Sequence, residues 1–312
     1  MFRRLLIDTD TASDDAVALV MALRNPAVRV EAITVVAGNV PLDQATQNAL
    51  YTRELCESEV PVYQGRAAPL VRPLETAQFV HGEDGMGDIG LPLSGRAADG
   101  ADAVRVLVDT LMKSPGEIDL VTLGPLSNVA EALAIEPAIA RAVKQCFVMG
   151  GKCSGPGNIT PVAEYNFWAD PEAAQAVARS GMRLTIIGWD MSVRHAVFGP
   201  SEAAALRALE PLGEFCVDIQ ATVDTYARNE SGLAGFDLPD PIAMAVAIEP
   251  SMAQFEEHHL DVAVGGDDRG RDEVDWLNTS GKEKSARITT WVDRQSFLGM
   301  LYNAGRDGPS RA

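Results

Sequence analysis

The start of the chain places a group of aspartates where an apolar strand gives way to a helix. Residues 5–9 are mostly apolar, which predicts a short buried strand. Residues 14–25 carry apolar side chains at helical spacing, which predicts a helix whose apolar stripe is Val17, Leu19, Val20 and Leu23. The aspartates at this junction are Asp8, Asp10, Asp14 and Asp15. A strand that leads directly into a helix is the beginning of a βα unit and therefore favours an α/β fold.

The aspartates at this junction also indicate a metal site. Carboxylates so close together repel one another unless a hard cation neutralises them, and Ca²⁺ and Mg²⁺ bind through carboxylate and carbonyl oxygens. An aspartate in the first turn of a helix is also a common cap that favours the helix dipole. Capping explains Asp14 and Asp15 but not Asp8 and Asp10. The sequence therefore favours a divalent cation at this position.

Short β-branched runs alternate with helical patterns along the rest of the chain. Further strands are expected at residues 31–37, 118–123, 146–149 and 184–187, and further helices at 42–56, 101–112 and 171–179. This alternation predicts an α/β fold with an open, mainly parallel, doubly wound (Rossmann-like) sheet flanked by helices. No segment between the termini has the composition of a linker, so we expect a single domain over residues 1–312.

The carboxyl ends of the expected strands are where a ligand is expected to bind. In doubly wound sheets ligands bind beyond these ends, at the point where the strand order reverses. Two glycine-rich stretches, 80–95 and 150–161, are long enough to be binding loops. The tail from 306 to 312 is expected to be frayed. The notable residues at strand ends are Asp8, Asp10, Gly38, Asn39, Leu123, Gly124, Gly150, Gly151 and Asp190.

Composition excludes several classes of partner. Acidic residues exceed basic ones by 44 − 26 = 18, so the phosphate backbone of a nucleic acid would be repelled. No apolar run approaches the length that crosses a bilayer, and residues 1–4 lead into a strand without the pattern of a secretory signal. The cysteines form no Cys-x-x-Cys pair, which favours free thiols. We therefore expect a cytoplasmic protein with neither a membrane nor a nucleic acid as its partner.

The opening aspartate segment and five later segments, in order, resemble the inosine-uridine-preferring nucleoside hydrolases, which cleave the N-glycosidic bond of ribonucleosides. The opening Asp-x-Asp-x-x-x-Asp-Asp is the family fingerprint, and the resemblance covers nearly the whole chain. One such segment would be weak evidence, whereas an ordered set is specific. The later segments are 37–39 (AGN), 123–128 (LGPLSN), 149–151 (MGG), 158–166 (NITPVAEYN) and 240–241 (DP).

The resemblance implies a Ca²⁺-dependent hydrolase. Carried over residue by residue, it gives Asp10, Asp15, Asp240 and the carbonyl of Leu123 as the Ca²⁺ ligands, all of them hard oxygen donors. It also implies that Asp10 is the general base that activates the attacking water, as in glycoside hydrolysis through an oxocarbenium-like transition state. The substrate is then a small nucleoside, the role is purine or pyrimidine salvage, and the assembly is a homo-oligomer, dimeric or tetrameric.

The resemblance also implies the ribose site. Asp14, Asn39, Asn158, Glu164 and Asn166 match positions that hold the ribose hydroxyls, and Met149 matches the position that packs against the sugar. Carboxylates and amides suit hydroxyls, which both donate and accept hydrogen bonds. Each asparagine alone would more often be ordinary turn chemistry. The ordered set favours the binding role.

The chain departs from the family pattern at Pro239. Members that hydrolyse inosine and uridine carry a histidine immediately before the last metal aspartate, as the acid that protonates the departing base, and proline cannot donate a proton. Departure of the base should then depend on its intrinsic leaving ability or on a substitute such as His81, which lies in a segment that resembles the flexible pocket loop. His195 is expected to be structural, and His258 and His259 are expected to lie on the surface.

Aromatic side chains are the other candidates for contact with the base, because some members of the family stack aromatics on a purine. An aromatic is more often part of the core than of such a platform. The helical segment around Tyr226 precedes a glycine-rich turn and is expected to form a mobile wall over the base. The candidates are Phe79, Trp168, Trp189, Tyr226 and Phe236.

Two other functions stay open at this point. A phosphatase of the haloacid-dehalogenase type also begins with a strand and Asp-x-Asp, with Asp8 as nucleophile and Asp10 as acid, but it leaves the ribose-like segments unexplained. A nucleoside- or ribose-binding protein of the same fold, catalytically weak because of Pro239, is the stronger alternative. The preferred base and the oligomeric state do not follow from the sequence.

Overall fold

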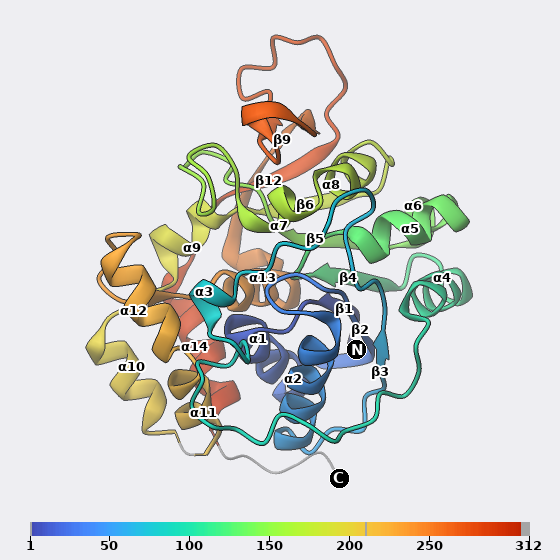
Figure 1. Cartoon of the computed structure of the whole chain (residues 1–312). Coiled ribbons are helices and arrows are strands. Elements are labelled where there is room, and N and C mark those ends of the chain that lie inside the picture. The colour runs from blue at the N-terminus through green and yellow to red at the C-terminus, as the bar shows by residue number, and fades with distance from the viewer. Residues whose placement is uncertain (1, 210, 307–312) are drawn as a thin grey trace.

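The centre of the molecule is an eight-stranded sheet in the order β3-β2-β1-β4-β5-β6-β12-β9 (Figure 1). The structure is a computed structural model that describes residues 2–209 and 211–306. Every pair in this sheet is parallel except β12 with β9. The strands are β1 (Arg3–Thr9), β2 (Val28–Val35), β3 (Val62–Gln64), β4 (Ile118–Thr122), β5 (Gln145–Met149), β6 (Leu184–Ile187), β9 (Ala253–His258) and β12 (Ala286–Val292).

The strand order reverses between β1 and β4, and the helices change faces at the same place. The crossovers β1-α1-β2 and β2-α2-β3 lead outward in one direction, and those through α4, α5 and α8 lead outward in the other. Two separate apolar clusters cover the two faces of the sheet. The expected doubly wound, mainly parallel sheet in a single α/β domain is confirmed, although the bounds 1–312 include residues outside the described part. The helices are α1 (Ser13–Arg24), α2 (Leu42–Leu55), α3 (Gln78–His81), α4 (Ala103–Lys113), α5 (Ser127–Ile135), α6 (Ile139–Ala142), α7 (Tyr165–Ala169) and α8 (Pro171–Ala178).

Helix α1 differs from the expected amphipathic helix because it is buried on every side. All residues from Ser13 to Leu23 are buried, including those outside the stripe that the sequence predicts. The reason is nonlocal. Helices from the C-terminal third, α13 (Pro239–Ile248) and α14 (Arg294–Gly305), pack against α1 together with α2. The first turns of α1 and α13 are thereby brought close together at one end of the sheet.

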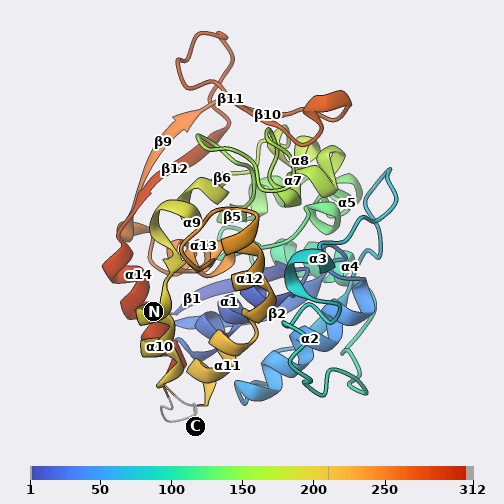
Figure 2. The same ribbon diagram turned by 60° about the vertical axis from the view of Figure 1, so that its left-hand side comes forward.

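The chain after β6 supplies α12, one of two neighbouring helices beside the sheet, and the last two strands at the edge of the sheet. Helices α3 and α12 lie side by side, and β9 and β12 extend away from the body of the sheet (Figure 2). His258, expected at the surface, is instead buried at the end of β9, where its ring lies 4.9 Å from that of Trp276. The remaining elements are α9 (Trp189–His195), β7 (Val197–Phe198), α10 (Pro200–Arg207), α11 (Leu212–Asp218), α12 (Ala221–Asn229), β8 (Phe236–Asp237), η1 (Pro250–Met252), β10 (Leu260–Val262), η2 (Gly266–Asp268) and β11 (Asp272–Val274).

Several smaller expectations concern termini, thiols and membranes. The four cysteines, Cys56, Cys146, Cys153 and Cys216, are buried and unpaired, as expected. Across the described residues we find no helix with the length and apolar character of a membrane span. The expected frayed tail lies, apart from Arg306, outside the described residues.

Candidate active site

A pocket opens beyond the carboxyl ends of β1, β4 and β5, where the strand order reverses. The strand-end residues Leu123 and Met149 contribute to its floor, and α3 and α12 form the wall that faces them. This is the place where a doubly wound sheet binds its ligand. The polar and charged residues that line the pocket are Asp14, Asn39, His81, Asn158, Glu164, Tyr165, Asn166, Tyr226, Ser231, Asp237 and Asp240.

Asp10 is held in a space that admits no side chain beside it. Its Oδ2 accepts a hydrogen bond of 2.6 Å from the backbone N–H of Asn39, and its Oδ1 is buried without a partner among the described residues. A Cβ at Gly38 would lie 2.1 Å from Oδ2, and one at Gly124 would lie 2.5 Å from Oδ1. These two strand-end glycines are therefore required by the close approach of Asp10.

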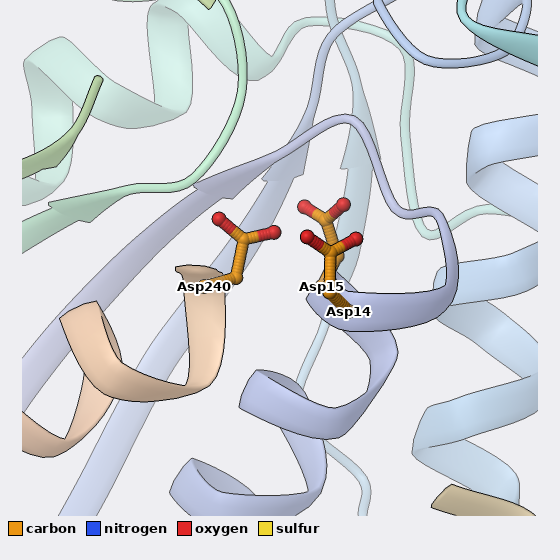
Figure 3. A group of neighbouring side chains, drawn as sticks. All are labelled: Asp14, Asp15 and Asp240. Atoms are coloured by element: carbon orange, nitrogen blue, oxygen red, sulfur yellow. The ribbon is translucent and has the colours of Figure 1, made fainter. Parts of the chain in front are cut away.

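The carboxylates of Asp14, Asp15 and Asp240 converge at the meeting point of two helices. Asp240, in the first turn of α13, reaches toward Asp14 and Asp15 at the start of α1 (Figure 3). One oxygen from each lies within 4.8 Å of the others. Asp15 also caps its helix, because it accepts hydrogen bonds from the N–H of Ala12 at 2.9 Å and from Oγ1 of Thr9 at 2.5 Å. Asp15 therefore both caps α1 and belongs to the carboxylate cluster.

Burial and mutual repulsion make this cluster a poor place for bare carboxylates. Burial, with the neighbouring charges, raises the pKa of Asp14 to about 7 and that of Asp15 to about 6. The same causes raise the pKa values of Asp10 and Asp240 well above the ordinary range. Oδ1 of Asp14, like Oδ1 of Asp10, is buried without a hydrogen-bond partner in the described part of the chain. Hard anionic oxygens in excess of their protein donors fit a divalent cation.

Asp8 does not belong to this cluster, although the sequence places it in the same run. Its side chain is fully buried and accepts hydrogen bonds from Thr34 at 2.6 Å and Asn128 at 2.8 Å. Asn128 in turn accepts from the N–H of Arg66. Burial raises the pKa of Asp8 to about 7. Strand alternation alone would put Asp8 and Asp10 on one face, but β1 ends at Thr9 and Asp10 lies beyond it, so the two side chains have different neighbours. Asp8 joins β1, β2 and α5 behind the pocket.

The ribose-site candidates surround the pocket, and several already have protein partners. The side-chain amide of Asn166 donates to the Leu123 carbonyl at 2.7 Å and lies 3.4 Å from the sulfur of Met149. Glu164 caps α7, with one carboxylate oxygen accepting from the N–H of Asn166 and the other from that of Gly151. Asn158 accepts from the N–H of Tyr165. These bonds fix the side chains in place while a carbonyl or carboxylate oxygen keeps a further lone pair for a ligand.

His81 lies at the carboxylate end of the pocket. Its Nδ1 is 3.0 Å from Oγ of Ser13 and 3.7 Å from a carboxylate oxygen of Asp14. Burial lowers its pKa to about 4. At neutral pH the ring is therefore uncharged, which suits hydrogen bonding and disfavours proton donation.

Three of the five aromatic candidates line the pocket. Phe79 on α3 and Tyr226 on α12 meet edge to face with ring centroids 5.7 Å apart, and Trp189 lies at the start of α9. Trp168 is instead covered by Arg269 at 3.9 Å, and Phe236 stacks on Phe198. Those two aromatics are structural. His195, which lies edge-on to Trp291, is also distant from the pocket lining.

Comparison with known proteins decides the family. The family model described as inosine-uridine preferring nucleoside hydrolase matches residues 5–299. The chain belongs to this family. A pyrimidine-specific ribonucleoside hydrolase, RihB, of Escherichia coli strain SE11 is 38% identical over 308 residues, which are 97% of each protein. The expectation of an N-glycosyl hydrolase is thereby confirmed, and the phosphatase interpretation has no support.

Solved nucleoside hydrolases share the whole fold. A plant nucleoside hydrolase, PpNRh1, superposes with a TM-score of 0.93 at 29% identity over 98% of this chain and 99% of its own. A purine-preferring ribonucleoside hydrolase from Gardnerella vaginalis has a TM-score of 0.90 at 31% identity, over 97% and 98% of the two chains. Relatives named for pyrimidine and for purine substrates are thus both similar to this chain.

Asp237 lines the pocket of this nucleoside hydrolase, although the sequence alone did not indicate it. Asp237 lies in β8, three residues before Asp240, and is 8% exposed. Its Oδ2 accepts hydrogen bonds from Nε1 of Trp189 at 2.8 Å and from Oγ of Ser192 at 2.6 Å. An aspartate just before a proline-led helix resembles an ordinary helix cap, and both hydrogen-bond donors lie more than forty residues away, so no local pattern pointed to it.

Proposed function

We propose that this chain hydrolyses the N-glycosidic bond of ribonucleosides to ribose and free base with Ca²⁺ as cofactor. The observation that carries the proposal is the convergence of Asp14, Asp15 and Asp240, because Asp14 and Asp240 line a pocket whose other walls carry amide and carboxylate side chains. We assign Asp10, Asp15, Asp240 and the Leu123 carbonyl as the residues that would hold the cation. When bound, such a cation acidifies a water molecule and orients the sugar diol.

Asp10 is the proposed general base. It is buried and held by the Asn39 N–H, and its second oxygen has no partner among the described residues, so that oxygen can accept a proton from water. Its raised pKa makes it a stronger base than an exposed aspartate. Gly38 and Gly124 pack closely against the carboxylate and keep it in one position. A carboxylate in a fixed position can hold the attacking water in the orientation that the reaction needs.

The ribose is proposed to lie between Met149 and the amide and carboxylate side chains around it. Asp14, Asn39, Asn158, Glu164 and Asn166 would bind its hydroxyls, and His81 would reach the ribose or the base. As the glycosidic bond breaks, positive charge develops on the sugar, and these preorganised acidic and amide oxygens stabilise it. Glu164 and Asn166 already make hydrogen bonds within the protein, so less conformational entropy is lost when their side chains bind the ribose.

The second candidate function is a catalytically weak nucleoside- or ribose-binding protein with the same site. Pro239 is the observation that favours it, because this residue lines the pocket and cannot protonate a base. We further propose a cytoplasmic homo-oligomer in purine or pyrimidine salvage that binds no nucleic acid. The excess of acidic residues supports the last point.

The deciding experiment is incubation of the purified protein with a panel of purine and pyrimidine ribonucleosides and a 4-nitrophenyl riboside. Release of ribose and free base is measured with Ca²⁺ present and again after exhaustive chelation. We expect ribose release that depends on Ca²⁺. Tight nucleoside binding without ribose release would favour the binding protein, and full activity after chelation would contradict the metal assignment.

A further inference from the structure

We propose that Asp237 is the acid that protonates the departing base in this chain. The inference rests on the proposed hydrolysis. It assigns the task to a carboxyl group on β8 instead of the position occupied by Pro239.

Asp237 reaches the same pocket as the carboxylate cluster from a separate element. It lines the pocket together with Pro239 and Asp240, and it is the last residue of the two-residue strand β8. Its charge acts on both Asp14 and His81, so it lies at the end of the pocket that those residues border. An acid at this end can reach a base whose ribose lies on the cluster.

The hydrogen bonds of Asp237 hold one oxygen of its carboxyl group in place. Oδ2 accepts from two donors on α9, Nε1 of Trp189 and Oγ of Ser192. The backbone N–H of Asp237 also bonds to its own carboxyl group, and no side chain among the described residues donates to Oδ1. A hydroxyl at Oδ1 would therefore be free to donate to a ligand in the pocket, while the indole and the serine keep the group in a single orientation.

The surroundings of Asp237 favour its protonated form. Burial raises the pKa of Asp237, and this effect exceeds the lowering by its hydrogen bonds and by the neighbouring His81. A buried carboxyl group with a raised pKa keeps its proton to a higher pH than an exposed one, which suits a general acid. The two donors on Oδ2 oppose this shift without reversing it.

Other pocket side chains are less suited to the task. His81 has a lowered pKa, and a cation bound beside Asp14 would lower it further. Both oxygens of Glu164 already accept backbone N–H groups. Asp14 and Asp240 belong to the converging cluster. Asp237 combines a fixed carboxyl group with an oxygen to which no side chain among the described residues donates.

In the proposed step, Asp237 gives a proton to the departing base while water attacks the sugar. The bond from the anomeric carbon to the base nitrogen breaks, and its electron pair stays on the base. The proton on Oδ1 of Asp237 moves to the base, which leaves as a neutral molecule, while Asp10 takes a proton from the attacking water. Exchange with solvent then returns a proton to Asp237 and removes one from Asp10, so the net reaction consumes one water.

The test compares Asp237→Asn with the unchanged protein on two kinds of substrate. The amide can still accept from Trp189 and Ser192, but it cannot transfer a proton. With inosine and uridine we expect kcat to fall roughly 10²–10⁴-fold, the usual effect of losing a general acid. With 4-nitrophenyl riboside, whose leaving group needs little protonation, we expect kcat to be nearly unchanged, which also shows that the variant is folded.

Two further variants serve as controls. Asp119→Asn changes a buried aspartate at the opposite end of β4, paired with Arg3 and Lys144, and should leave the ratio of the two rates unchanged. Ser192→Ala removes one of the two donors that position Asp237 and should lower the inosine and uridine rates selectively, by a smaller factor. If Asp237→Asn fails to fold, the Ser192→Ala result decides.

The outcomes separate this inference from the proposed function. Equal losses on both substrates, or no loss on either, would overturn the role of Asp237 while leaving hydrolysis intact. An unchanged protein that cleaves only the activated riboside would show that no acid operates. An unchanged protein that cleaves none of these substrates would overturn the hydrolysis itself and with it this inference.

Discussion

At the scale of single residues, the site depends on how closely side chains and backbone approach one another. Asp10 lies between two strand-end glycines and one backbone N–H, so its carboxylate has a single position. That position is the one from which it would take a proton from water. The position of the Asp10 carboxylate and its ability to accept a proton can therefore be tested by separate substitutions.

Asp10→Asn changes the chemistry and keeps the shape. The amide oxygen can still accept from the Asn39 N–H, so the fold should persist, whereas hydrolysis should fall by roughly 10²–10⁴-fold because an amide is no general base. The loss grows if Asp10 is also a Ca²⁺ ligand. Rates, melting temperature and bound Ca²⁺ should be measured together. Near-normal turnover with normal metal content would contradict the role of Asp10.

Gly124→Ala changes the shape and keeps the chemistry. The added Cβ would lie 2.5 Å from Oδ1 of Asp10, so the carboxylate or the strand end must move. We expect a destabilisation of about 1–3 kcal/mol, as for other overpacked sites, together with a loss of hydrolysis. The matched control is Gly299→Ala in α14, where a Cβ meets nothing within 4 Å and stability should not fall. Normal activity of Gly124→Ala would show that the position of Asp10 is not critical.

At the scale of elements, the pocket has a sheet side and a helix side with different roles. The strand ends and the first turns of α1 and α13 carry the charged groups, whereas α3 and α12 contribute Phe79 and Tyr226. The two helices are in contact, and these two rings meet edge to face. The helix side should therefore affect binding of the base more than the chemical step.

Tyr226→Ala tests this division. An aromatic pair contributes roughly 0.5–1.5 kcal/mol beyond buried area, so KM for a nucleoside should rise roughly 2–10-fold while kcat changes little. Thr225→Ala is the control on the same helix, because its exposed hydroxyl bonds to the Ala221 carbonyl and lies outside the pocket lining. A large fall in kcat with KM unchanged would place Tyr226 in the chemical step instead.

At the scale of the whole molecule, a set of buried carboxyl groups couples stability to pH and to cations. Asp8, Asp14 and Glu164 have pKa values of about 7 and Asp15 of about 6 in the fold, against ordinary values near 4. The folded state therefore binds more protons than the unfolded chain between these values. Its stability should fall as the pH rises from about 4 to 7, and a bound cation should offset that loss.

The melting temperature should show this coupling directly. Without divalent cations we expect it to be lower at pH 7.5 than at pH 5, and we expect Ca²⁺ to raise it more at pH 7.5, where cations no longer compete with protons. Sodium chloride at equal ionic strength is the control for screening. An equal Ca²⁺-induced shift at both pH values would argue against binding to these carboxyl groups.

The sequence by itself determined the features that depend on near neighbours. Alternating apolar runs indicated the order of the central strands and helices, and the strand-end segments indicated the family and most residues around the pocket. The tertiary structure alone decided what depends on distant contacts. It separates Asp8 from the cluster through Thr34 and Asn128, and buries α1 beneath α13 and α14. It also places Asp237 against Trp189 and Ser192. Burial, charge repulsion and hydrogen bonding act between atoms that are close in space, and no local pattern records which distant segments will meet.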